Sequence, residues 1–479
     1  MPTSTLPPQL LDLLRAELRA DQIAHSPEQM LVYECDGQTL SRAIPDVVVY
    51  PETTADIQAA VRACAATGTP FLARGAGTGL SGGAVAARNG LIIEMARMNC
   101  VLAIDADNRT ATVQPGLVNL HLSRATHPLG LHFAPDPSSQ SACTVGGNVA
   151  ENSGGPHTLK YGVTTNHILS LLVVLPDGTL LRTCCDDAGY DLTGLFVGSE
   201  GTFGIATEIV VRLVPNPEAV RTLLAVFTTI DDASATVAGV IRAGVVPAAM
   251  ELMDQLAIEA VERHIRAGFP TDAAAVLLIE IDGAAIELDD QAARIEAICR
   301  DNHARDVQHA TDEATRAKLW KGRKQALGAM GKIAKAYYTH DGVVPPDRLP
   351  DALRGIADIA RRHELRVANV CHAGDGNLHP LILYDPDNAA EVQRVHDAGS
   401  EILRLCVDLG GTLTGEHGIG VEKQDCMPWL FSDDDLDHMR RVRDVFDPQQ
   451  ICNPAKVFPT GAKCGEVRTA RVLKTGGWL

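Results

Sequence analysis

The stretch Arg74-Gly75-Ala76-Gly77-Thr78-Gly79-Leu80-Ser81-Gly82-Gly83 places five glycines within nine residues. It follows Phe71-Leu72-Ala73, an apolar run that predicts a short strand. Glycine adopts positive φ and lets a ligand approach the backbone closely, and successive N–H groups in such a loop form a nest for anions. The stretch therefore predicts a loop that wraps the phosphates of a cofactor. A flexible surface loop is the alternative.

Two common phosphate-binding motifs do not match this stretch. A Walker loop ends in Gly-Lys followed by Ser or Thr, and that ending is missing. A Rossmann fingerprint begins well at Gly75-Ala76-Gly77, but Leu80 stands where its third glycine belongs. The segment that follows, Leu91-Ile92-Ile93-Glu94-Met95, predicts a strand where a Rossmann unit has a helix.

Two later segments have a similar composition. Pro135-Asp136-Pro137-Ser138-Ser139 leads to a run of small and polar residues from Thr144 to Pro156. Its apolar members Val145, Val149 and Ala150 can be buried, which favours a backbone-rich wall around a planar cofactor over a disordered linker. Residues 198–205, Gly-Ser-Glu-Gly-Thr-Phe-Gly-Ile, add further backbone donors just before a predicted strand.

The C-terminal half carries a second set of functional residues. His372 and His379 lie seven residues apart in Cys-His-Ala-Gly-Asp-Gly-Asn-Leu-His-Pro, and Glu416 and His417 are adjacent in Gly-Glu-His-Gly-Ile-Gly. A strand-and-turn path can bring the first two imidazoles to one point. Two histidines and one carboxylate suit a catalytic Zn²⁺ or Mn²⁺ site with open positions. A pair of histidines used only for packing or at the surface is the alternative.

Composition limits the classes of function. The 479 residues predict two or three domains. A formal charge of −18 argues against a nucleic-acid partner, whose phosphates need Lys and Arg. No stretch approaches the roughly 18 apolar residues of a membrane span, and no secretory signal is evident. The twelve cysteines show no CxxC spacing, so we expect reduced thiols and no iron–sulfur cluster.

The apolar pattern predicts two domains. Thr53 or Thr54 should cap a helix that runs through Ala66 and ends at Gly68. Residues 168–175 should form a strand that turns at Pro176-Asp177-Gly178 and pairs with residues 179–183. We interpret residues 40–215 as a hairpin-rich α/β domain, Pro215-Asn216-Pro217 as a linker, and the remainder as an α+β domain with an antiparallel sheet.

The three glycine-containing segments, in this order and spacing, resemble the FAD-binding domain of the vanillyl-alcohol oxidase/p-cresol methylhydroxylase flavoproteins. The His and Glu motifs narrow the resemblance to the branch that oxidises D-2-hydroxy acids, which includes D-lactate dehydrogenase, D-2-hydroxyglutarate dehydrogenase and the flavin subunit of bacterial glycolate oxidase. Residues 372–383 are most similar to the last of these. The resemblance covers about residues 30–460.

The resemblance implies an α+β fold, in which a two-subdomain PCMH-type FAD-binding domain is joined to an antiparallel-sheet substrate (cap) domain. The expected divisions are an N-terminal helical segment (1–40), the FAD-binding domain (41–215), the substrate and metal cap (216–445) and a C-terminal segment that returns to the FAD domain (446–479).

The resemblance also implies which residues hold FAD: Arg74, Gly75, Ala76, Gly77, Thr78, Gly79, Ser81, Gly82, Pro135, Asp136, Ser139, Thr144, Gly146, Gly147, Asn148, Asn152, Ser153, Gly155, Glu200, Gly201, Gly204, Ile205 and Asn453. The metal ligands it implies are His372, His379 and Glu416.

The same comparison implies catalytic roles. His417 is the expected general base for the substrate hydroxyl, with an orienter of Glu416 as the alternative role. Flavin N5 is expected to take the hydride. Arg323 is expected to bind the substrate carboxylate, since a guanidinium can contact it with two N–H groups. The alternative places Arg323 on a solvated helix face, with Lys321 and Lys324 as competitors.

Substrate size is inferred from three further positions. Leu327, Thr339 and Leu381 stand where, by resemblance, enzymes for 2-hydroxyglutarate have polar groups, so a small monocarboxylate such as glycolate or D-lactate is expected. D-2-hydroxyglutarate, a non-catalytic flavin subunit and an oxidase that uses O₂ are the alternatives. The expected electron acceptor is a quinone, a cytochrome or an iron–sulfur subunit. The chain is expected in the cytoplasm, with attachment to the inner membrane through an acceptor complex as the alternative, and as a homo-oligomer or hetero-complex.

Overall fold

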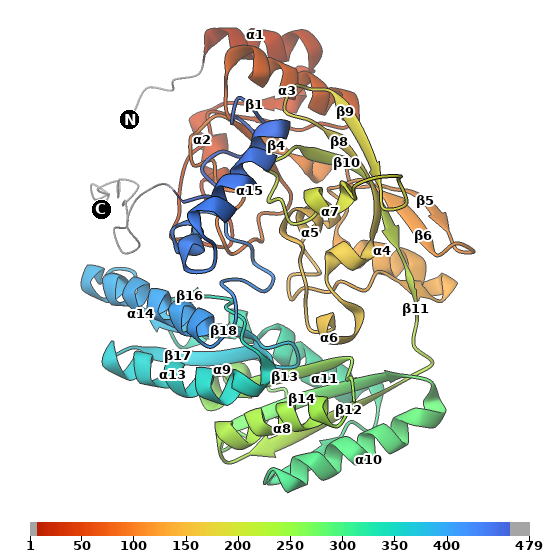
Figure 1. Cartoon of the computed structure of the whole chain (residues 1–479), viewed down its shortest axis with the longest axis vertical. Coiled ribbons are helices and arrows are strands. Elements are labelled where there is room, and N and C mark those ends of the chain that lie inside the picture. The colour runs from red at the N-terminus through yellow and green to blue at the C-terminus, as the bar shows by residue number, and fades with distance from the viewer. Residues whose placement is uncertain (1–6, 460–479) are drawn as a thin grey trace.

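The first sheet forms from the strands around the glycine stretch. In this computed structural model (Figure 1), which describes residues 7–459, its strand order is β1 (Ile23–Ala24), β2 (Val47–Val49), β4 (Leu91–Glu94) and β3 (Phe71–Arg74). Both neighbours of β4 pair with it in parallel, and β1 pairs with β2 in antiparallel orientation. Helices α1 (Pro8–Glu17) and α3 (Thr54–Thr67) pack their apolar side chains against this sheet.

The predicted helix α3 is confirmed at both ends. The Thr53 side chain accepts a hydrogen bond from the Asp56 N–H, which satisfies one of the free donors at the helix start. Gly68 ends the helix with φ of 63°, a left-handed conformation that glycine adopts without strain.

The second sheet has five strands in the order β5 (Val101–Asp105), β6 (Thr110–Val113), β10 (Ile205–Arg212), β8 (Ile168–Val174) and β9 (Leu180–Cys184). All its pairs are antiparallel. The predicted hairpin is confirmed, because Val174 pairs with Leu180 and Ser170 with Cys184. Around this sheet lie α4 (Asn119–Thr126), α5 (Val145–Glu151), α6 (Thr158–Tyr161), α7 (Thr193–Phe196), and the two short strands β7 (Leu131–His132) and β11 (Val214–Pro215).

Helix α5 lies within the segment expected to be a backbone wall. Thr144 caps it by accepting a hydrogen bond from the Gly147 N–H, and Val145 and Val149, four residues apart, are buried on one face. The sequence pattern did not predict this helix, because the segment contains two glycines and glycine disfavours helix interiors. Packing of the two valines outweighs that preference.

The third sheet is fully antiparallel and has seven strands. Its order is β15 (Asp306–His309), β12 (Ala219–Phe227), β14 (Ala275–Gly283), β13 (Ala249–Asp254), β17 (Arg366–His372), β18 (Asn377–Tyr384) and β16 (Ala336–Thr339). Successive residues of each strand point to opposite faces of the sheet, and each face has its own apolar core. Leu223 and Leu224 of β12, for example, pack in different cores. The first face is covered by α8 (Ile230–Arg242), α10 (Ala285–Asp301), α13 (Leu349–Arg362) and α14 (Ala389–Asp408), and the second by α9 (Gln255–His264), α11 (Glu313–Lys324) and α12 (Ala326–Ala329).

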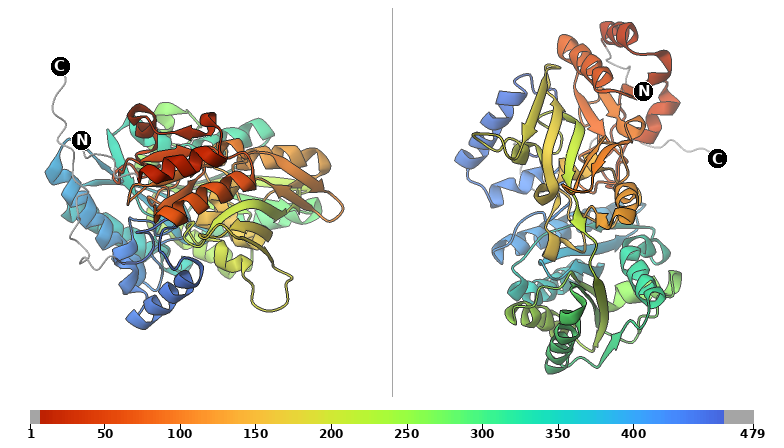
Figure 2. Two further views of the ribbon diagram at one scale, coloured as in Figure 1. Left: turned by 90° about the horizontal axis from the view of Figure 1, so that it is seen from above. Right: turned by 90° about the vertical axis from the view of Figure 1, so that its right-hand side faces the viewer.

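The sheets divide the described chain into two lobes, which the right-hand view of Figure 2 separates vertically. The first lobe contains the first two sheets, and the second lobe contains the third sheet with its helices. The chain is back in the first lobe at α15 (Asp433–Phe446), whose Phe446 ring packs against Phe196 and Phe203. Beyond α15, the Phe71 N–H donates to the Ile451 carbonyl (2.8 Å) and the Asn453 N–H to the Phe71 carbonyl (2.7 Å). The last 20 residues of the predicted C-terminal segment, 460–479, lie outside the described residues.

The remaining helix in the N-terminal part is α2 (Pro27–Met30). Within residues 7–459, none of the helices combines the length and the apolar character that crossing a membrane requires.

Candidate functional site

A cavity of about 380 Å³ lies between the two lobes. Glycine-rich segments of the first lobe line one part, and Arg323, His379, Glu416 and His417 line the other. The predicted cofactor residues that line it are Gly75, Ala76, Gly77, Thr78, Gly79, Ser139, Thr144, Gly146, Gly147, Asn148, Ser153, Glu200, Gly201, Gly204, Ile205 and Asn453.

Seven other predicted cofactor residues are not among the residues that line this cavity, and their contact with the cofactor stays a prediction. Arg74 is buried and donates to the Cys35 carbonyl (2.8 Å). The Asp136 carboxylate is bound by Lys324 and His157, and the Asn152 side chain accepts from the Thr165 N–H. The complete set is Arg74, Ser81, Gly82, Pro135, Asp136, Asn152 and Gly155.

The glycines of the lining fit a ligand that approaches the backbone. A Cβ atom on Gly75 would lie 2.3 Å from the Thr144 Oγ1, and one on Gly146 would lie 2.6 Å from the Pro115 Cβ. These positions therefore exclude larger side chains, and the wall stays thin enough for a planar ring and a pyrophosphate to meet backbone N–H groups. Asn453 joins the wall to the returning C-terminal segment, since its Nδ2 donates to the carbonyls of Gly83 (3.1 Å) and Glu200 (2.7 Å).

The histidine hairpin is formed by β17 and β18. Val370 pairs with His379 and His372 with Asn377, so both histidines lie on the same face of the third sheet. The turn between them requires glycine at 376, because its φ is 78° and a Cβ there would lie 1.9 Å from the Val344 carbonyl oxygen. The expected strand-and-turn path is confirmed.

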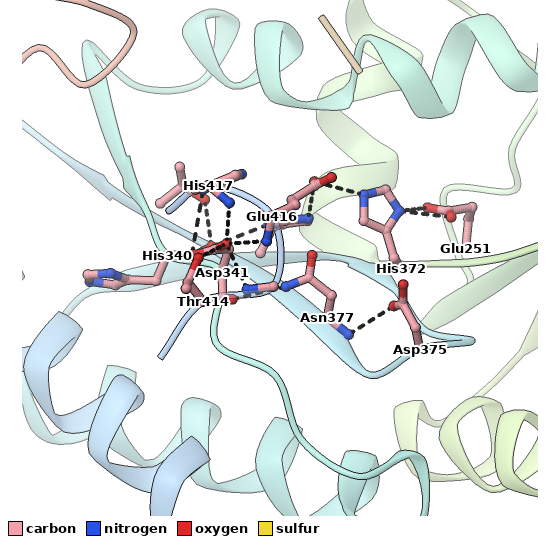
Figure 3. Close-up of polar contacts among 12 residues, drawn as sticks. Glu251, His340, Asp341, His372, Asp375, Asn377, Thr414, Glu416 and His417 are labelled. Atoms are coloured by element: carbon pink, nitrogen blue, oxygen red, sulfur yellow. Dashed lines mark hydrogen bonds and ion pairs between the residues drawn. The ribbon is translucent and has the colours of Figure 1, made fainter. Parts of the chain in front are cut away.

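Glu416 meets the two histidines from a separate loop. Its Oε1 lies 3.2 Å from the His372 Nε2 (Figure 3). The same oxygen lies 3.4 Å from the His379 Nε2. One donor atom from each of the three residues falls within 4.8 Å of the others. The Glu416 Oε2 is buried and has no hydrogen-bond partner among the described residues. This donor set fits a divalent cation, because neutral imidazole nitrogens and a carboxylate are ligands of Zn²⁺ and Mn²⁺.

Arg323 lies at the end of α11 and lines the cavity. Its side chain is 1% exposed, so the alternative of a solvated helix face is wrong. Of the two competitors, Lys321 is exposed, whereas Lys324 lines the cavity and binds Asp136 at 3.0 Å.

His417 also lines the cavity. Its ring stacks on that of His379, with centroids 5.0 Å apart and an angle of 15° between the planes. Burial lowers the pKa of His417 to about 4, which Asp341, 3.8 Å from its Nδ1, only partly offsets. The imidazole is therefore neutral at pH 7 and has a lone pair that can accept a proton.

Comparison with known proteins assigns the family. The family model described as FAD linked oxidases, C-terminal domain, matches residues 216–457, and the model described as FAD binding domain matches residues 45–184. The chain is a member of the FAD-linked oxidase family. It is therefore an FAD-linked oxidoreductase, and the resemblance found in the sequence is confirmed.

Curated relatives of this FAD-linked oxidase align over most of their length. The chain is 44% identical to "Glycolate oxidase subunit GlcD" of Escherichia coli (strain K12), over 95% of this chain and 92% of the relative. It is 41% identical to the protein of the same name from Bacillus subtilis (strain 168), over 90% and 93%. It is 33% identical to "Probable D-lactate dehydrogenase, mitochondrial" of Danio rerio, over 86% and 84%.

Solved structures share the fold of this oxidase. p-Cresol methylhydroxylase with substrate bound superimposes with a TM-score of 0.79 over 94% of this chain and 96% of that chain, at 16% identity. 4-Ethylphenol oxidase from Gulosibacter chungangensis gives 0.78 over 95% and 99%, at 17% identity. The PCMH-type fold predicted from the sequence is confirmed.

Two buried carboxylates that contact the candidate site of this oxidase were missed by the sequence reasoning. Glu251 on β13 is fully buried, accepts a hydrogen bond from the His372 Nδ1 at 2.9 Å, and forms an ion pair with Arg323. Asp341, just after β16, binds the backbone of the loop that carries Glu416. The sequence signal that could have found them is a single acid within or beside an apolar strand. Such an acid is expected to be buried, and carboxylates are almost never fully buried unless they are paired.

Glu251 sets the orientation of His372. With Nδ1–H bound to Glu251, the Nε2 of His372 faces Glu416 and His379. Burial would lower the pKa of His372, but the Glu251 and Glu416 carboxylates outweigh burial and raise that pKa to about 10.

The three positions used to infer substrate size lie in different surroundings. Leu327 lines the cavity. Thr339 and Leu381 pair with each other on β16 and β18, and Leu381 is buried in the apolar core of the third sheet. Of the three positions, Leu327 is the one that lines the cavity, and the inference drawn from Thr339 and Leu381 stays a prediction.

Proposed function

We propose that this enzyme oxidises a small D-2-hydroxy acid, of the size of glycolate or D-lactate, to the 2-oxo acid, with FAD as hydride acceptor and a divalent cation at His372, His379 and Glu416. The observation that carries the proposal is one continuous cavity, which runs from the glycine segments to Arg323 and the donor cluster. The names of the relatives, glycolate oxidase subunit and D-lactate dehydrogenase, support this substrate class.

When bound, FAD supplies a hydride acceptor, and Zn²⁺ or Mn²⁺ supplies a Lewis acid that lowers the pKa of a coordinated hydroxyl. The residues of the chain bind and orient the substrate. Arg323 binds the carboxylate, and burial strengthens that contact because water does not compete for the guanidinium. The neutral imidazole of His417 accepts the hydroxyl proton.

Two observations bear on substrate size. Leu327 offers an apolar surface, and a second carboxylate against it would lose its solvation without a partner. Lys324, however, lines the same cavity beside Arg323, and this favours D-2-hydroxyglutarate as the second candidate substrate. The Asp136 carboxylate already binds Lys324 at 3.0 Å, so we favour the smaller acid.

Electrons from the flavin then go to a separate acceptor, which we propose is a quinone, a cytochrome or an iron–sulfur subunit. The word subunit in the names of two relatives supports a complex of this kind. We propose that the enzyme works in the cytoplasm or, through such a complex, at the inner membrane.

Anaerobic bleaching of the flavin tests the proposal. Glycolate, D-lactate, L-lactate and D-2-hydroxyglutarate are mixed in turn with wild-type enzyme and with His417→Ala. We expect the small D-acids or glycolate to bleach the wild-type flavin fastest and His417→Ala to slow bleaching by about 10²- to 10⁴-fold. His438→Ala, an exposed histidine on α15, is the matched control and should react like wild type.

Three outcomes would reject parts of the proposal. If none of the acids bleaches the flavin, the substrate class is wrong. If His417→Ala reacts at the wild-type rate, His417 is not the base. If the enzyme keeps full activity after a chelator has removed Zn²⁺ and Mn²⁺, the cation has no catalytic role.

A further inference from the structure

The loop of residues 414–420 carries both Glu416 and His417 and lies between α14 and α15. Its shape depends on where its backbone N–H groups point. Those of Gly415, Glu416 and His417 donate to one atom, the Asp341 Oδ2, at 3.0, 2.9 and 2.7 Å (Figure 3). The Thr414 hydroxyl donates to the same oxygen at 2.8 Å. This part of the loop is therefore a nest built around one carboxylate oxygen.

The other oxygen of Asp341 is bound as well. Asp341 is fully buried, and its Oδ1 forms an ion pair with Lys423, which is also buried and donates to the Gly418 carbonyl at 3.0 Å. Burial alone would raise the pKa of Asp341, but Lys423, His417 and the loop N–H groups outweigh burial and hold that pKa below its ordinary value. Both oxygens must accept, so an asparagine would turn its NH₂ group toward a donor in either orientation.

A carboxylate of the first lobe binds the rest of the loop. Glu200, in the turn before β10, accepts from the Ile419 N–H through Oε1 and from the Gly420 N–H through Oε2, both at 2.7 Å. Glu200 also lines the cavity. The Gly418 N–H donates to the Thr414 hydroxyl at 3.0 Å. Every N–H group from residue 415 to residue 420 thus has an acceptor, and five of these six N–H groups donate to a carboxylate, three to Asp341 and two to Glu200 of the other lobe.

This arrangement explains how two neighbouring side chains serve one site. In an extended segment, successive side chains point to opposite sides. In this loop Glu416 contacts His372 and His379, and His417 stacks on His379. The backbone curls around Asp341, which brings both side chains to the cavity. Gly418 allows this path, because a Cβ there would lie 2.3 Å from the Glu151 Oε2.

We propose that Asp341 and Glu200 are positioning residues, which together fix the loop of residues 414–420 in the form that presents Glu416 and His417 to the cavity. The inference rests on the proposed function for the roles of Glu416 and His417, but the loop geometry does not. Neither carboxylate needs to touch the substrate. Each acts through the backbone of the loop.

Hydrogen exchange tests the geometry without any substrate. In the FAD-loaded enzyme, exchange is followed by mass spectrometry in a peptide that covers residues 412–421, for wild type, Asp341→Asn and Glu200→Gln. We expect exchange in this peptide to be at least tenfold faster in each variant. Titration of the same proteins with Zn²⁺ alone should show affinity reduced by about 10- to 100-fold in Asp341→Asn, the range typical for loss of a group that orients metal ligands.

Asp254→Asn is the matched control. Asp254 is another carboxylate of the third sheet that accepts backbone N–H groups, from Ala257 (3.0 Å) and Asn369 (2.7 Å). Its loss should leave exchange at residues 412–421 and Zn²⁺ affinity unchanged. Equal changes in Asp254→Asn and Asp341→Asn would overturn the proposal, because they would reflect general destabilisation.

Two variants with smaller changes, at Thr414, test the same proposal if Asp341→Asn does not fold. Thr414→Ala removes the hydroxyl between Asp341 and Gly418, and Thr414→Ser keeps it. We expect faster loop exchange in the first and wild-type exchange in the second. The proposal is overturned if Thr414→Ala keeps the loop exchange rate and Zn²⁺ affinity of the wild type. The same result in Glu200→Gln would also overturn it. If the loop responds as expected while no hydroxy acid bleaches the flavin, only the proposed function fails.

Discussion

Glu251 is a buried residue that faces groups from two different elements, His372 on β17 and Arg323 at the end of α11. Its carboxylate therefore fixes the proposed metal ligand and the proposed substrate anchor relative to each other. Glu251→Gln would place an NH₂ group against one of these donors and leave the Arg323 charge without its buried counter-ion.

For Glu251→Gln we expect Zn²⁺ affinity to fall by about 10- to 100-fold. The KM for the hydroxy acid should rise as Arg323 loses its position. The free energy of unfolding should fall by about 3 to 5 kcal/mol, because a buried charge remains unpaired. Equilibrium dialysis, steady-state kinetics and urea unfolding measure the three effects. Unchanged Zn²⁺ affinity and KM would show that Glu251 serves stability only.

Sequence reasoning predicted the residues that meet at the candidate site and missed the carboxylates that hold them in place. His372, His379, Glu416, Arg323 and His417 stand in short motifs, where composition and resemblance both point to them. Glu251 and Asp341 are single acids whose partners lie 121 and 75 positions away along the chain, at His372 and Glu416. Only the pairing of β13 with β17 brings Glu251 to His372, and no local pattern encodes that register.

Among elements, the hairpins and capped helices were predictable because their signals are local. The β8–β9 turn and the Thr53 cap each depend on a few adjacent residues. Helix α5 was missed because its stability comes from tertiary packing of Val145 and Val149, not from helix propensity.

Helix α11 carries a prediction about how an element positions Arg323. Gly322 faces the chain before α11, and a Cβ there would lie 2.6 Å from the Ala267 Cβ and 2.6 Å from the Phe269 ring. Gly322→Ala should therefore push the end of the helix outward and lower the free energy of unfolding by about 1 to 3 kcal/mol. Displacement of Arg323 should also raise the KM for the hydroxy acid.

The matched control for Gly322→Ala is Gly328→Ala, a glycine-to-alanine change in the neighbouring helix α12. A Cβ at Gly328 would meet no atom within 4 Å, so alanine should be neutral or should stabilise by up to about 1 kcal/mol. Thermal unfolding and steady-state kinetics compare the two variants. Equal stability and equal KM in both would show that the close packing at Gly322 does not position Arg323.

At the scale of the whole molecule, His157 joins the two lobes. Its Nδ1 donates to Asp136 in the first lobe at 2.9 Å, and its Nε2 faces Glu280 of the third sheet at 3.3 Å. Its ring stacks on Trp320 of α11, with centroids 5.4 Å apart. Lys324 and Arg316, also on α11, bind the same two carboxylates. The imidazole of His157 and the ammonium group of Lys324 thus both attach the lobe that carries Arg323 to Asp136 of the first lobe.

The charge on His157 makes this attachment depend on pH. Burial lowers the pKa of His157, but Asp136 and then Glu280 outweigh burial and raise it from 6.5 to about 10. A raised pKa in the folded state means that the stabilisation is complete below pH 6.5 and is lost as pH rises toward 10. His157→Gln should therefore be less stable than wild type at pH 6.5, by on the order of 1 to 4 kcal/mol. The difference in unfolding free energy should shrink steadily up to pH 10, since titrations common to both proteins cancel. Urea unfolding at several pH values measures it, and a difference that stays constant with pH would mean that His157 joins the lobes as a neutral ring.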